Sequence, residues 1–165
     1  MKTFSFVYMI AVPYLLLGAV VGIVRISGDN VGKGTLIAAL AAVVLLCMIA
    51  VAACIMHNTA AIFSLDPETA ALQNLIIKLS YLPAHLLMAL ITLGMMNPFL
   101  LLASWIPLFL SWCMIAYSGF GNIGACVNLL RRGKCSVKMS VLLCVLSFCF
   151  FGDIIGAAVQ TVKSK

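Results

Sequence analysis

The sequence predicts an all-α protein, a polytopic membrane helical bundle of about five transmembrane helices with short loops. Of the 165 residues, 65% are hydrophobic and only 8% are charged, and the mean hydropathy is +1.23. In a soluble domain, about a quarter of the residues carry a charge. The apolar residues fall into runs of about 20 or more, the length that crosses a hydrocarbon core of about 30 Å. We therefore expect a single integral membrane domain over residues 1–165.

The first two spans are predicted over residues 4–26 and 35–56, joined by the polar, glycine-rich stretch 27–34. Such a stretch is typical of a turn, so we expect these spans to form an antiparallel hairpin. The first run is longer than the apolar core of about 7–15 residues in a signal peptide, and no small-residue cleavage site precedes a soluble domain. It is therefore interpreted as a spanning helix.

The third and fourth spans are predicted over residues 72–96 and 98–118. Asp66 can cap a helix that has Pro67 at its first position and Glu68 near its positive end. Asn97 ends this helix, because the residue before a proline, here Pro98, is disfavoured in the α region. The turn has almost no polar residues, so a re-entrant hairpin that enters the bilayer and returns is the alternative for this pair.

The fifth span is predicted as one helix over residues 139–162. It follows residues 131–138, the densest basic cluster of the chain. Basic residues favour the cytoplasmic side of a membrane. With five spans, the N-terminus is then cytoplasmic and the C-terminus is outside. The basic residues next to the spans would divide five inside against four outside, which is a weak bias.

Two pairs of glycines can bring helices close together in lipid. Gly18 and Gly22 in the first span, and Gly152 and Gly156 in the last, have the small-xxx-small spacing that allows close helix contact. Packing within the molecule is the main interpretation, and oligomerisation is the alternative.

The third span carries a candidate intramembrane polar face. Lys78, Tyr81 and His85 recur at spacings that place them on one side of a helix. An ionisable group at the membrane centre costs about 2.5–3.5 kcal/mol on insertion scales, so each is a candidate functional residue. The face could carry an ion, a proton or a ligand, and His85 can titrate near neutral pH. The main interpretation, however, is that Lys78 reaches the interface while the other two bond to neighbouring helices.

Asp153 is the only acidic residue within a predicted span. Counted along one helix from residue 139, it lies about 21 Å into the membrane, a depth that matches Arg25 better than Lys78. We therefore expect an ion pair between Arg25 and Asp153 if the first and last spans touch. A structural pair is the main interpretation, and a functional ion site is the alternative.

No catalytic, cofactor-binding or metal-binding residues are predicted, and the chain is not expected to be an enzyme. Hydrolase, phosphate-loop and metal-ligand motifs are absent from the sequence. The four acidic residues and two histidines are too few for most such sites. The seven cysteines lack Cys-x-x-Cys spacing and are interpreted as small apolar residues. The net charge of +6 reflects basic residues at the ends of apolar runs, so nucleic acid is not an expected partner.

Residues 117–124, which run into residues 130–134, resemble a feature of small uncharacterised multi-pass membrane proteins of low-GC Gram-positive bacteria. The likeness covers only this segment. It implies a bacterial plasma membrane and no particular activity. The sequence as a whole predicts a small accessory or interaction protein, whose partners are the lipid bilayer and either a second copy or another membrane protein. The alternative is a small transporter or channel that uses the polar face of the third span.

Overall fold

The computed structural model describes residues 2–28, 33–94, 105–149 and 152–165, and these are arranged as a helical bundle. The described helices are α1 (Lys2–Gly28), α2 (Lys33–Phe63), α3 (Pro67–Gly94), α4 (Trp105–Arg131), α5 (Val137–Leu146) and α6 (Gly152–Ser164). The predicted all-α helical bundle is confirmed at this level. By length and composition, three segments among the described residues could cross a membrane: Ala41–Phe63, Pro67–Leu93 and Leu108–Arg131.

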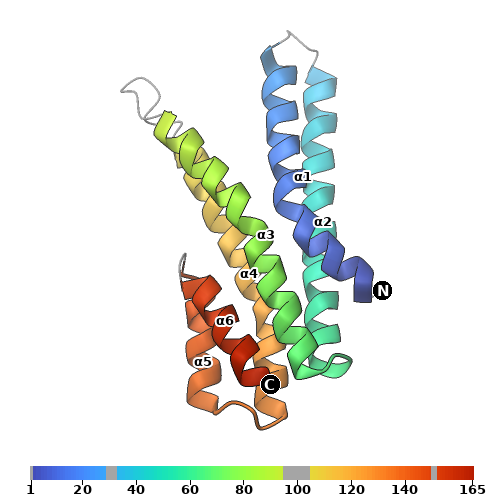
Figure 1. Cartoon of the computed structure of the whole chain (residues 1–165). Coiled ribbons are helices and arrows are strands. Elements are labelled where there is room, and N and C mark those ends of the chain that lie inside the picture. Colours follow the sequence, from blue (N-terminus) through green and yellow to red (C-terminus); the bar gives the residue numbers. More distant parts are fainter. Residues whose placement is uncertain (1, 29–32, 95–104, 150–151) are drawn as a thin grey trace.

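Two antiparallel helix pairs form the body of the molecule. α1 packs on α2, and α3 packs on α4; the two pairs touch through α2 with α4 and α1 with α3 (Figure 1). Their shared core is a cluster of buried apolar side chains that includes Met9, Ile77, Tyr81 and Met114. Figure 1 shows the pairs close together below and diverging above. We call the end where residues 131–138 lie the basic end.

α4 continues well beyond its predicted end at residue 118 and stops at Arg131. Glycines in this part favour close packing over a turn, because a Cβ on Gly124 would lie 2.7–2.8 Å from three atoms of Asn58 on α2. Two residues beyond this end lies Gly133, which has a φ of +69°. There the Lys134 amide donates to Leu129 O and the Gly133 amide to Leu130 O, the Schellman arrangement that a left-handed glycine permits.

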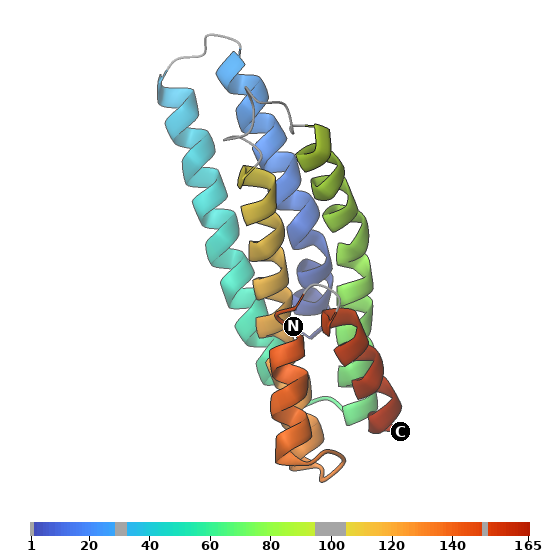
Figure 2. The same cartoon turned by 90° about the vertical axis from the view of Figure 1, so that its left-hand side faces the viewer.

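The predicted fifth span is two helices in the structure. α5 ends at Leu146, and α6 runs back beside it from Gly152 (Figure 2). The Lys134 ammonium, in the connection after α4, donates to the carbonyl oxygens of Ser164 and Lys165. The chain therefore returns to the basic end. The sequence instead predicts that residues 131–138 and the C-terminus lie on opposite sides of the membrane.

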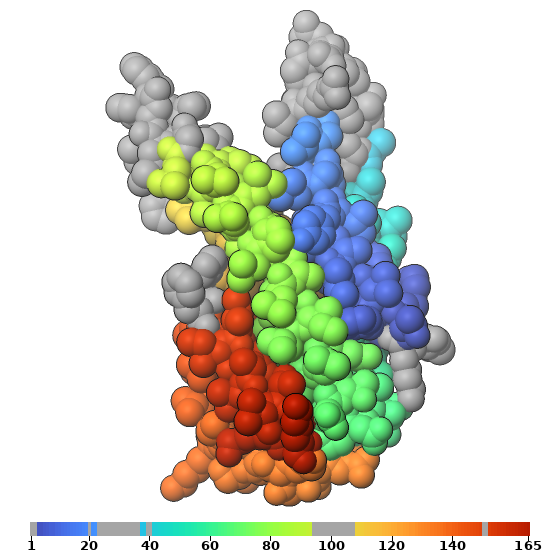
Figure 3. Space-filling model, viewed as in Figure 1, coloured from blue at the N-terminus to red at the C-terminus, as the bar shows by residue number. Residues whose placement is uncertain are grey.

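This hairpin of α5 and α6 covers part of the bundle only. It packs on α3 and α4, and Figure 3 shows α6 against the part of α3 that lies nearer the basic end. The re-entrant alternative in the sequence concerned the turn at Asn97 and Pro98. That turn falls in residues 95–104, outside the described residues.

Candidate functional site

Lys78 and Asp153 form the only ion pair between residues that the structure describes. Lys78 comes from the middle of α3 and Asp153 from the first turn of α6, 75 residues later. The Lys78 side chain is 0% exposed and the Asp153 side chain 9%. Ser118 of α4 joins the pair: its hydroxyl donates to Asp153 Oδ2 at 3.2 Å and accepts from Lys78 Nζ at 3.4 Å. Three helices therefore meet at one buried charged site.

The arrangement compensates the cost of burying the two charges. A buried ion is expensive unless its partner and further hydrogen bonds satisfy it, and here both are present. Asp153 also stands in the first turn of α6, where the helix dipole favours a negative charge. The pair is thus neutral as a unit, and it attaches the start of α6 to α3.

A network of buried amide and hydroxyl groups continues from the pair towards the basic end. The Asn74 amide donates to Asn122 Oδ1 at 2.6 Å and to Gln160 Oε1 at 2.9 Å. Asn122 in turn donates to the hydroxyl of Ser147, and Gln160 Nε2 lies 3.0 Å from Cys126 Sγ. The network links α3 and α4 to both arms of the hairpin.

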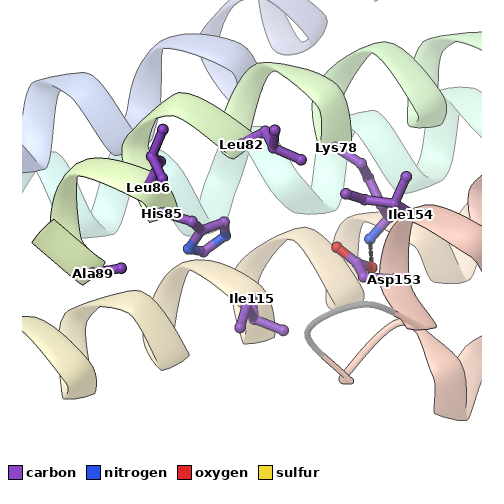
Figure 4. Close-up of a pocket in the computed structure, with 8 residues that line it drawn as sticks. All are labelled: Lys78, Leu82, His85, Leu86, Ala89, Ile115, Asp153 and Ile154. Carbon is purple, nitrogen blue, oxygen red and sulfur yellow. Dashed lines mark hydrogen bonds and ion pairs between the residues drawn. The ribbon is translucent and has the colours of Figure 1, made fainter.

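A cavity of about 290 Å³ lies on the other side of the pair. Its lining is mostly aliphatic and comes from α3, α4 and α6: Lys78, Leu82, His85, Leu86, Ala89, Ile115, Asp153 and Ile154 (Figure 4). His85 Nδ1 and Ser111 Oγ are 2.8 Å apart and hydrogen bonded. His85 is seven residues along α3 from Lys78, about 10 Å. The cavity therefore joins His85 to the ion pair along an apolar wall.

No family model, curated protein or solved structure matches this chain. Within the described residues, no group of three or more His, Cys, Asp or Glu side chains could hold a metal ion.

The residues of the predicted polar face have different surroundings in the structure: two line the cavity and one contacts α1. Lys78 and His85 both line the cavity. Tyr81 points elsewhere, because its hydroxyl donates to Met9 O of α1 at 2.8 Å and its side chain is buried. Positions seven apart on a helix point in nearly the same direction, whereas a residue three positions on points about 60° away.

The predicted partner of Asp153, Arg25, has a side chain outside the described residues, so that pair stays a prediction. The structure gives Asp153 a partner in Lys78. The depth assigned from the sequence assumed a single helix from residue 139. Because the chain turns back before Gly152, Asp153 lies level with Lys78 instead.

Sequence reasoning missed Ser118, Asn122, Ser147 and Gln160, which complete the polar site. A signal for two of them is present. Ser118 and Asn122 are four residues apart, so they share one face of a helix.

Proposed function

We propose that the chain crosses a plasma membrane four times and ends in a re-entrant hairpin. The candidate spans on α2, α3 and α4 are joined by α1, whose 27 residues extend about 40 Å. This makes four spans. With 10 and 13 residues, α5 and α6 are each shorter than a core of about 30 Å requires. Backbone that leaves a helix inside a bilayer has to be buried in protein. At the start of the turn, Ser147 is 0% exposed and its hydroxyl accepts from Asn122, whereas Phe148 and Cys149 are exposed.

The charge distribution supports this topology and gives its orientation. Seven of the ten basic residues would lie towards the basic end: Lys2, Arg131, Arg132, Lys134, Lys138, Lys163 and Lys165. Two, Arg25 and Lys33, would lie towards the opposite end, and the remaining one is the buried Lys78. Seven against two is a stronger bias than five against four. By the positive-inside rule, this topology has both termini in the cytoplasm, and the sequence resemblance implies a bacterial membrane.

This topology predicts a pattern of thiol labelling in intact cells. A cysteine at Asn30 should react with an impermeant reagent, and cysteines at Asp66, Arg132 and Lys163 should react only after the membrane is opened. The unsubstituted chain gives the background from its own cysteines. Labelling at Lys163 in intact cells would instead support five spans.

We further propose that the protein acts as a small transporter or channel for a proton or small polar solute. The observation that carries this proposal is the position of the Lys78–Asp153 pair, at the end of a cavity that also contains His85. Ionisable residues within membrane spans commonly mark such pathways. The Asn74, Asn122 and Gln160 network supports it by extending the polar groups towards the basic end.

The pair suggests how such a site would respond. A proton that reached Asp153 through the cavity would neutralise the carboxylate and leave the Lys78 charge without compensation. An uncompensated buried charge is strongly unfavourable. Protonation would therefore favour movement of the hairpin turn away from α3, and loss of the proton would restore the contact.

A flux assay tests this proposal. The full chain is reconstituted into liposomes that contain a pH-sensitive dye, and a potassium diffusion potential drives proton entry. We expect faster acidification than in protein-free liposomes. A variant with both Lys78→Leu and Asp153→Leu should return to the protein-free rate, because it removes the charges and keeps apolar volume. If liposomes with the unsubstituted chain took up protons and small polar solutes no faster than protein-free liposomes, this function would be excluded.

The accessory or interaction protein predicted from the sequence is the second candidate. Among the described residues, every buried side-chain nitrogen and oxygen atom has a hydrogen-bond partner. That completeness also fits a polar core that only fixes the hairpin in place. In this case the double leucine variant would stay folded, neither protein would pass solutes, and the partner would be a second copy or another membrane protein.

A further inference from the structure

An apolar groove of about 500 Å³ runs between α2 and α4, separate from the ion pair. Val51, Ile55 and Ile62 line it from α2, and Tyr117, Phe120 and Ile123 from α4. From Val51 to Ile62 it spans eleven residues, about 16 Å along the helix. This is close to half of a hydrocarbon core of about 30 Å. The groove therefore has the length of one leaflet.

Contacts between the two helices hold the groove open in a fixed shape. The Asn58 amide donates to Phe120 O at 2.9 Å, and Asn58 Oδ1 accepts from the Gly124 amide at 2.5 Å. Tyr117 donates to Ala50 O at 2.8 Å. A binding site that is already formed saves the ligand the cost of ordering it.

The Arg131 side chain stands where the groove reaches the basic end. Arg131 Nη1 donates to the carbonyl of Ile62, a lining residue, at 3.2 Å, and its guanidinium lies 5.1 Å from the centre of the Phe63 ring. Arg132 is the next residue and is exposed. A guanidinium has five N–H donors in a planar fork that suits phosphate, and the bond to Ile62 uses one of them. Donors for a phosphate therefore stand at the mouth of the groove.

We propose that this groove binds one acyl chain of an anionic phospholipid of the cytoplasmic leaflet, with the headgroup phosphate at Arg131 and Arg132. The leaflet rests on the topology proposed above, whereas the site is independent of any transport function. The apolar walls, the length of one leaflet and the basic mouth all match this ligand. A second copy of the chain would bring its own basic end to the same level, and like charges would then oppose the contact.

Lipid titration of the delipidated full chain in detergent, followed by native mass spectrometry, tests the proposal. The probes are phosphatidylglycerol and phosphatidylcholine with identical acyl chains. We expect one phosphatidylglycerol to bind preferentially, by about fivefold for each arginine. Arg131→Gln with Arg132→Gln should remove the preference. Lys163→Gln with Lys165→Gln, which removes two exposed basic residues beyond the groove lining, should leave it unchanged.

A variant that fills the groove separates the chain from the headgroup. Val51→Trp keeps every charge and should weaken the binding of both lipids, so it decides the question even if the arginine variant does not fold. Equal binding of the two lipids by the unsubstituted chain would indicate annular lipid only and overturn the proposal. So would an equal loss of preference in the arginine and lysine variants, or an unaltered affinity in Val51→Trp.

Discussion

Replacement of Lys78 by leucine is expected to lower the free energy of unfolding by about 3–5 kcal/mol, because the Asp153 carboxylate would remain buried without its cation. The measurement is thermal or denaturant unfolding in a fixed detergent, followed by circular dichroism. Lys138→Leu is the matched control, since Lys138 is an exposed lysine near the basic end, and such a surface change should stay within about 0.5 kcal/mol.

The double variant with Lys78→Leu and Asp153→Leu should recover most of this loss. Apolar side chains of similar volume often replace a buried ion pair without loss of stability. The two single variants and the double variant form a thermodynamic cycle that isolates the interaction of the pair. If the double variant were as unstable as the sum of the single ones, the two side chains would not interact, and the docking of α6 would depend on Asn74 and Gln160 instead.

Gly124→Ala should have the second large effect, a destabilisation of about 1–3 kcal/mol from overpacking. The added Cβ would lie 2.7 Å from Asn58 Oδ1 and 2.8 Å from both the Cα and the carbonyl oxygen of Asn58. Since two of these atoms belong to the backbone, α2 and α4 would have to move apart. Unfolding in the same detergent measures the change, and lipid binding in the groove should weaken with it.

Gly18→Ala is the control for this substitution and is expected to stabilise the protein by about 0.4–1 kcal/mol, as alanine does when it replaces a helical glycine without strain. A Cβ built at Gly18 meets no described atom within 4 Å, and the same holds at Gly22. A larger loss of stability in Gly18→Ala than in Gly124→Ala would support the predicted role of the first glycine pair in close helix contact.

The presence of the first four helices, though not the end of α4 at Arg131, could be predicted from the sequence because each contains a long apolar run. The start of α3 also followed from local chemistry, with Pro67 as its first residue and Glu68 in its first turn. These signals arise from residues that are adjacent in the chain, so they can be read directly from the sequence.

The hairpin could not be predicted in the same way. Hydropathy along residues 139–162 is high whether the chain passes straight through a bilayer or turns back within it. Only the polar residues of α6 mark the difference: Asp153 and Gln160 are seven apart, and both face partners on α3. Those partners lie 75 and 86 residues away, so the reason for the turn is found in tertiary contacts.

Three residues of the candidate site could be identified from the sequence, but the pairing of Asp153 could not. The cost of a charge in lipid identified Lys78, His85 and Asp153 as residues that need an explanation. Pairing Asp153 required its depth, and that depth was counted along a helix that the structure breaks after Leu146.

The turned-back hairpin also sets an order of events during synthesis. Lys78 is made 75 residues before Asp153, which is roughly 4–15 s at about 5–20 residues per second. Throughout that interval, the carboxylate that neutralises this ammonium group in the finished bundle does not yet exist. In the proposed topology, α3 is therefore made before the partner of Lys78 exists, and the docking of α6 completes the buried pair. That topology makes the docking of α6 a folding step inside the membrane.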